Sequence, residues 1–160
     1  MQNPPYDKLE PRFHATILYN GASWRGRTIE PFIDGKDGWA QWMKDAAVEG
    51  RTTTGYYLRK LVDENHDFAI SQQSTQPWVA FRLAEVYLNY AEACLRKNDV
   101  ETAVAYIDKV RQRKGVNLPK LKNVNTVDAA FEALRHERKV ELAFEGLYYW
   151  DLRRWNVAER

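Results

Sequence analysis

Acidic side chains are the residues of this 160-residue chain best suited to chemistry. A glycoside-cleaving enzyme needs two positioned carboxylates, and a hydrolase that works through a nucleophile needs a base beside it. Five acids of the first half are considered for this role: Asp34, Asp37, Asp63, Glu64 and Asp67. Nothing in their spacing pairs them, and acids in loops are usually solvated. The sequence therefore does not favour an enzyme.

Two local clusters contain residue types that bind metal ions. His136-Glu137 with Glu141 lacks the second histidine of a zinc protease motif, and the other histidines are scattered. The run from Asp63 to Asp67 (DENHD) has oxygen ligands that suit calcium, without the fixed spacing of a known calcium loop. We interpret this run as a solvated turn, with calcium as the alternative, and expect no cofactor.

Aromatic residues in the first half suit sugar binding. Flat rings stack on the C–H face of a pyranose, while Asn, Asp and Arg groups reach its hydroxyls. The candidate ligand-binding residues are Asn20, Trp24, Arg25, Trp39, Trp42 and Tyr56. Trp24 follows Asn-Gly-Ala-Ser and is expected at an exposed turn. Trp39 and Trp42 share one helical face, so packing onto a scaffold is the favoured alternative for them. Tyr56 and Tyr57 point to opposite sides of a strand.

Composition narrows the class of protein. With 44% hydrophobic and 29% charged residues the chain is globular, with one core of ordinary size. A net charge of +2 is too weak to suggest nucleic-acid binding. The single cysteine, Cys94, lies in a helical apolar pattern and is expected in the core. The sequence contains no run of about 18 apolar residues, so it predicts no membrane span. The N-terminus lacks a signal-peptide pattern. The chain is thus expected to be cytoplasmic or a piece of a longer secreted protein.

The first part, residues 1–78, reads as a loop-rich segment with short strands. Six glycines between Gly21 and Gly55 break it into short pieces. Phe13–Tyr19 and Thr54–Val62 are predicted strands, and Trp39–Val48 is a predicted short helix or loop turn. We expect this segment to carry the ligand surface.

The second part, residues 79–160, reads as helical, so the predicted fold class is mostly α with a tetratricopeptide-like scaffold. Val79–Lys97 and Val100–Arg113 form a helical hairpin resembling one such repeat. A third helix is capped by Thr126 or Asp128 and runs to about Glu145, and Tyr148–Trp155 forms a short last helix. Polar residues in the first of these helices form a narrow stripe, which we interpret as its solvent face: Arg82, Glu85, Asn89, Glu92 and Arg96.

Charged residues occupy a stripe of the third helix that should be buried. At 100° per residue, Arg138, Glu141 and Glu145 fall on the same side as Leu134 and Leu142. Buried charges are costly unless they are paired. We predict an internal ion-pair lock in which the partners are the downstream arginines Arg153 and Arg154. Three tryptophans among these helices are expected in the core: Trp78, Trp150 and Trp155.

Three segments in order resemble motifs of the SusD/RagB family. They are FRLAEVYLNYAEA from Phe81, AYIDKVRQR from Ala105, and ERKVELAFEG from Glu137 followed by DLRRW from Asp151. Pro11-Arg12-Phe13, as a strand-opening element, and Tyr56–Lys60 fit more weakly. The resemblance covers about half of the chain and implies that the chain is the C-terminal portion of a longer protein.

The resemblance also implies a function. Members of this family are lipid-anchored on the outward-facing surface of a Gram-negative outer membrane, through an anchor outside this sequence. They bind glycans, or sometimes peptides, without catalysis, as the lid of a TonB-dependent (SusC-like) transporter. Their helices form a tetratricopeptide-like scaffold, and loops supply most of the ligand surface. The alternative is a tetratricopeptide-like adaptor that only holds another protein, although a single repeat is visible here.

Overall fold

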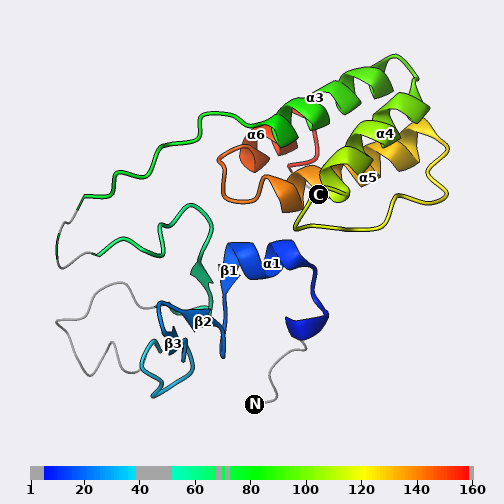
Figure 1. Ribbon diagram of the computed structural model, residues 1–160. Helices are drawn as coiled ribbons and strands as arrows, with labels where there is room; N and C mark the ends of the chain where they lie inside the picture. Colours follow the sequence, from blue (N-terminus) through cyan, green and yellow to red (C-terminus); the bar gives the residue numbers. More distant parts are fainter. Residues whose placement is uncertain (1–5, 39–51, 68–69, 71–72, 159–160) are drawn as a thin grey trace. The chain divides into compact units, whose positions relative to one another are not determined.

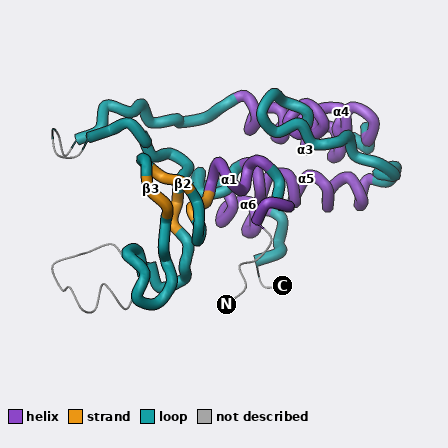
Figure 2. The backbone as a smooth tube through the Cα atoms, turned by 60° about the horizontal axis from the view of Figure 1, so that its bottom comes forward, coloured by secondary structure: helices purple, strands orange, loops and turns teal. Residues whose placement is uncertain are grey.

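The computed structural model describes the whole chain except residues 1–5, 39–51, 68–69, 71–72 and 159–160 (Figure 1). Two compact units follow one another along the sequence, Met1–Pro77 and Trp78–Arg160. The helix or turn predicted over Trp39–Val48 lies outside the described residues. The first unit contains short elements and long connections, and the second contains four helices in its described part (Figure 2).

The first unit begins with helical turns. A 3₁₀ helix, η1, covers Tyr6–Lys8, and α1 covers Pro11–Thr16 before the chain extends into strand β1, Ile17–Leu18. The strand predicted from Phe13 is therefore wrong for its first four residues, and Pro11 opens a helix instead of a strand. Proline fits the first turn of a helix because its fixed φ suits that position, where its missing N–H is not needed.

Two small antiparallel pairs follow. β2, Ser23–Trp24, and β3, Arg27–Thr28, form a hairpin in which Trp24 lies opposite Arg27. Its two turn residues, Arg25 and Gly26, both have positive φ (48° and 78°), as a type I′ turn requires. β4, Tyr57–Leu58, pairs with β1, so only two residues of the predicted Thr54–Val62 strand are in a ladder. Leu18, Ala22 and Ile29 form the small core between these elements.

The second unit begins with a helical hairpin. α3 covers Leu83–Arg96 and begins four residues later than predicted. α4 covers Val100–Arg111. Asn98, at a positive φ of 61°, makes the turn between the two helices, and the Asp99 side chain caps α4 by accepting the Thr102 N–H at 3.1 Å. Gln112 occupies the C-terminal cap position of α4, and Gly115 follows it at a positive φ of 90°.

α5, Val127–Glu141, and α6, Tyr148–Arg154, complete the unit. Thr126 caps α5 through the Ala129 N–H at 3.3 Å. α5 ends four residues before the predicted Glu145, and Phe144 and Gly146 have positive φ in the turn that leads to α6. The core of the unit consists of small and aliphatic side chains from α3, α4 and α5, among them Leu88, Ala91, Leu95, Ala103, Ile107, Ala130 and Leu134. The mostly helical fold class is confirmed.

Cys94 is a free thiol buried in this core, as expected for a small apolar side chain. None of the described helices is both long enough and apolar enough to cross a lipid bilayer.

Candidate functional site

Three of the candidate ligand-binding residues lie on one hairpin. Asn20 precedes β2, Trp24 is its last residue, and Arg25 is an exposed residue of the turn. The Gly21 N–H donates to the Ile29 carbonyl at 2.9 Å and closes the base of the hairpin. Trp24 is half-buried because it packs on the small core beneath, instead of standing free at the turn. The hairpin therefore presents part of one indole beside a guanidinium group.

Tyr56 lies elsewhere, in an aromatic cluster at the start of the unit. Its side chain is 42% exposed, and its hydroxyl is 3.1 Å from the Tyr6 hydroxyl. The Tyr6 ring lies 4.2 Å from Tyr19 and 5.7 Å from Phe13, centroid to centroid. The hydrogen bond with Tyr56 and burial raise the pKa of Tyr6 to about 12. A cluster of Tyr6, Phe13 and Tyr19 was not predicted, because an extended strand over Phe13–Tyr19 would hold the Phe13 and Tyr19 rings about 20 Å apart.

Asp37, one of the five acids considered for catalysis, has a structural role. It is buried and accepts two hydrogen bonds from Arg27, at 2.6 and 2.7 Å, and a third from the Glu30 N–H at 2.9 Å. Its backbone carbonyl accepts the Tyr57 hydroxyl at 2.8 Å. The hydrogen bonds with Asp37 raise the pKa of Arg27 further above its ordinary value. These contacts connect the hairpin to β4 and hold the carboxylate as a fixed ion.

Trp39 and Trp42 lie outside the described residues, so their placement stays a prediction. Among the described residues, no three His, Cys, Asp or Glu side chains are grouped so that they could hold a metal ion.

In the second unit, Glu141 and Glu145 are held by arginines from other segments. The Glu141 carboxylate accepts from Arg82 at 2.6 Å and from Arg113 at 2.8 Å, and Glu145 accepts from Arg82 at 2.7 and 2.8 Å. Burial disfavours the charged form of Glu141, but the hydrogen bonds from Arg113 and Arg82 outweigh it, so its pKa is lowered. The charged stripe of α5 is thus buried and neutralised.

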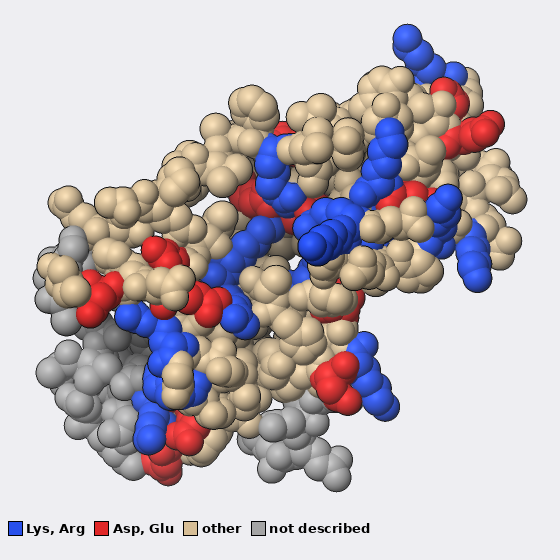
Figure 3. Space-filling view, viewed as in Figure 1, with Lys and Arg blue, Asp and Glu red and all other residues tan. Residues whose placement is uncertain are grey.

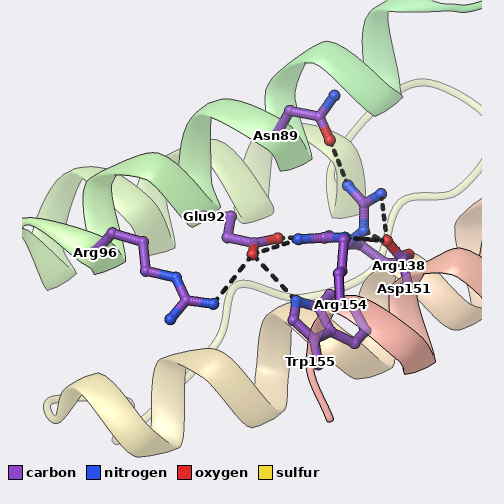
Figure 4. A network of polar contacts seen from close by, with 7 residues as sticks. All are labelled: Asn89, Glu92, Arg96, Arg138, Asp151, Arg154 and Trp155. Carbon is purple, nitrogen blue, oxygen red and sulfur yellow. Dashed lines mark hydrogen bonds and ion pairs between the residues drawn. The ribbon is translucent and has the colours of Figure 1, made fainter. Parts of the chain in front are cut away.

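A second network joins α3, α5 and α6 (Figure 4). Arg138 donates to both oxygens of Asp151, at 2.8 and 3.0 Å, and to the Asn89 side-chain oxygen at 2.6 Å. Asp151 also accepts from Arg154 at 2.8 Å. Arg138 is 4% exposed and Asp151 is buried as well. A bidentate arginine–carboxylate pair is the strong form of such contacts.

Glu92 of α3 also belongs to this network. It accepts two hydrogen bonds from Arg154, at 2.5 and 2.7 Å, and one from the Trp155 indole N–H at 3.1 Å. Burial opposes ionisation of Glu92, but the contacts with Arg154 and Trp155 outweigh it and lower its pKa. Figure 4 shows the Arg154 side chain between Glu92 and Asp151.

The partners predicted for the ion-pair lock are corrected by these contacts. Arg138 pairs with Asp151, Glu141 pairs with Arg82 and Arg113, and Glu145 pairs with Arg82. Arg154 belongs to the network, but its partners are Asp151 and Glu92. Arg153 donates to the Tyr149 hydroxyl at 3.2 Å. The partners were missed because they are up to 63 residues away in sequence, where helical periodicity carries no information.

The stripe on α3 is also corrected. Arg82, Asn89 and Glu92 form ion pairs and hydrogen bonds with α5 and α6, so this stripe is not simply a solvent face. Apolar residues on the other side of α3 are exposed, among them Leu83, Val86 and Tyr90. Two tryptophans expected in the core are also exposed, Trp78 by 85% and Trp150 by 63%, whereas Trp155 is buried. Asn89 and Arg96 are exposed, as predicted for the stripe, whereas Arg82 and Glu92 pair with charged groups of other segments.

Figure 3 shows Lys and Arg side chains and Asp and Glu side chains on the described part of the face that it draws.

Comparison with known sequences places the chain in a family. The family model described as "SusD family" matches residues 2–160, nearly the whole chain. The chain belongs to the SusD family. Among curated SusD relatives, SusD-like protein P25 of Formosa agariphila is 39% identical over 102 residues, and SusD-like protein P38 of the same organism is 30% identical over 86 residues. These alignments cover 63% and 50% of this chain but 19% and 17% of the relatives, so the chain spans about a fifth of their length.

Solved SusD structures share the fold. A SusD-like protein of Bacteroides fragilis superposes with a TM-score of 0.76 at 29% identity, covering 95% of this chain and 29% of that chain. A SusD superfamily protein of Bacteroides vulgatus has a TM-score of 0.65 at 24% identity, covering 98% of this chain and 31% of that chain, and supports the fold alone. The predicted family and the SusD-like helical fold are therefore confirmed.

Proposed function

We propose that this chain is part of a non-catalytic glycan-binding protein of a nutrient uptake system. In this proposal the whole protein is anchored on the outward-facing surface of the outer membrane and acts as the lid of a TonB-dependent, SusC-like transporter. The observation that carries the proposal is the match to the SusD family over residues 2–160. A gene for such a transporter directly upstream of this one would support the transporter part.

Two features of the structure support a binding role for the first unit. The hairpin presents Trp24 with Arg25 and Asn20, and the aromatic cluster presents Tyr56. Indole and phenol rings provide the flat apolar faces that pyranose rings stack on, and the polar groups beside them suit hydroxyls. In the second unit, by contrast, most charged groups on the facing sides of the helices are bound to one another, which suits a scaffold.

Substitution of Trp24 tests this proposal. Trp24→Leu keeps an apolar side chain against the small core but removes the flat ring, so we expect glycan affinity to fall about tenfold, the upper end of what one aromatic contact contributes. Calorimetric titration against a panel of polysaccharides would measure it, with the thermal unfolding midpoint recorded for each variant.

The matched control is Trp78→Leu, which removes an exposed indole from the second unit. We expect its affinity to equal that of the unmodified chain. Equal affinity for Trp24→Leu and Trp78→Leu would remove Trp24 from the site, and a chain that binds no glycan in the panel would contradict the proposed function itself.

A further inference from the structure

A pocket of about 610 Å³ lies in the first unit. Two short stretches line it, residues 62–65 and 75–77, both within Met1–Pro77. Its volume falls within the range of about 300–1,000 Å³ that is typical of small-molecule sites. The first stretch includes the first three residues of the DENHD run, for which the sequence predicts a solvated turn, with a calcium loop as the alternative. The structure gives this run a third possibility, the wall of a binding pocket.

One wall of the pocket is held by the folded part of the unit. Arg59 donates to both oxygens of Glu64, at 2.6 and 3.1 Å. Arg59 is fixed in turn, because its backbone N–H donates to the Thr16 carbonyl at 2.8 Å and its guanidinium to the His14 carbonyl at 3.3 Å. The Glu64 wall is therefore attached to α1 and is not an isolated loop.

The remaining lining groups are suited to hydroxyls. One Asp63 carboxylate oxygen accepts the Asn65 N–H at 2.9 Å, which leaves the other oxygen as an acceptor. The side-chain amides of Asn65 and Gln76 and the Thr75 hydroxyl make no hydrogen bond to another described residue. An amide both donates and accepts, and a carboxylate accepts from two adjacent hydroxyls. Such a set matches a ligand that offers several hydroxyl groups.

The charge of the lining limits the ligand further. The described lining residues include two carboxylates and no Lys or Arg, and of these two the Glu64 charge is paired, by Arg59. A carboxylate or sulfate on a ligand would therefore face the Asp63 charge without a compensating cation. Val62 and Pro77 add a small apolar surface suited to the C–H face of a sugar ring.

We infer that the pocket between residues 62–65 and 75–77 is a subsite for an uncharged, hydroxyl-rich sugar unit. This inference rests on the proposed glycan-binding function and deepens it, because it makes neutral glycans the preferred ligand class over uronate-containing or sulfated ones.

The experiment titrates the full chain with four neutral hexasaccharides, which are maltohexaose, cellohexaose, xylohexaose and mannohexaose, and with acidic hexagalacturonate. We expect a neutral hexasaccharide to bind tightest. We expect Asn65→Ala and Gln76→Ala each to weaken that binding about 3- to 10-fold, as the loss of one or two hydrogen bonds predicts. Gln112→Ala, an exposed residue at the end of α4, is the matched control and should leave affinity unchanged.

Charge is tested separately with Asp63→Asn, which keeps an oxygen that can accept the Asn65 N–H. It should improve hexagalacturonate binding, whereas Asp7→Asn, an exposed acid of η1, should not. Amide resonances of Asn65 and Gln76 should shift on titration in the unmodified chain, which reports on the pocket even if a variant is less stable.

Three results would overturn the inference. If glycans bind but the pocket variants match their controls and these resonances do not move, the pocket assignment fails while the proposed function stands. The inference also fails if hexagalacturonate binds at least as tightly as the tightest-binding neutral hexasaccharide. If no hexasaccharide binds the unmodified chain, the pocket assignment and the proposed function both fail.

Discussion

At the scale of single residues, the interior of the helical unit contains paired charges as well as apolar side chains. Glu141 is 2% exposed, and its carboxylate accepts hydrogen bonds from Arg82 and Arg113. Helical periodicity in the sequence predicted that Arg138, Glu141 and Glu145 face inward. It could not identify Arg82 or Asp151 as partners, because these lie on other helices or beyond a helix end, where only the tertiary fold determines the distance.

Arg138→Ala tests the weight of this ionic interior. The substitution removes three hydrogen bonds and leaves Asp151 buried with Arg154 as its remaining partner. Breaking a buried pair from one side costs about 3–5 kcal/mol, so the free energy of unfolding should fall by about that amount. Urea denaturation of the full chain measures it.

Lys139→Ala on the same helix is the control, because Lys139 is exposed and a surface substitution changes stability by only about 0.5 kcal/mol or less. Equal losses for Arg138→Ala and Lys139→Ala would mean that the Arg138 contacts do not stabilise the fold.

At the scale of elements, the sequence predicted the helices of the second unit better than the elements of the first. Apolar residues repeat at helical spacing through α3, α4 and α5, and Thr126 gave a recognisable cap. α1 was missed because the alternation in FHATILY is typical of a strand, and a helix of 6 residues is too short to show its own period. The predicted solvent stripe of α3 is correct for Asn89 and Arg96, which are exposed, but not for Glu92, which is buried and pairs with Arg154.

Those ion pairs should make helix packing sensitive to acid. The pKa values of Glu92 and Glu141 are lowered below their ordinary value of 4.5 in the folded chain. A carboxyl group with a lowered folded pKa stabilises the fold fully above its unfolded pKa, and this contribution is lost as the pH falls through the folded value. We therefore expect the thermal unfolding midpoint to be steady from neutral pH to about pH 5 and to fall below about pH 4.5.

Glu141→Gln separates this effect from general acid unfolding. The variant should be less stable at neutral pH and should lose less stability on acidification than the unmodified chain. Glu101→Gln, an exposed acid of α4, should follow the unmodified chain. If Glu141→Gln and Glu101→Gln show the same pH profile, the Glu141 pairs do not contribute to the acid response.

At the scale of the whole molecule, the two units have different characters. Trp78–Arg160 is a helical scaffold with an internal network of ion pairs, whereas Met1–Pro77 carries the hairpin, the aromatic cluster and the pocket. The sequence could predict this division of character from glycine content and periodicity. It could not predict the pocket or the aromatic cluster, because both depend on how irregular segments return to α1.

We propose that the ligand surface belongs to Met1–Pro77 and that Trp78–Arg160 serves as a scaffold. Mapping of backbone amide resonances during titration of the full chain with the tightest-binding hexasaccharide would locate the ligand surface. We predict that the resonances that shift belong to Met1–Pro77, with the β2–β3 hairpin and residues 62–65 and 75–77 among them. Shifts confined to α3, α4, α5 and α6 would contradict it.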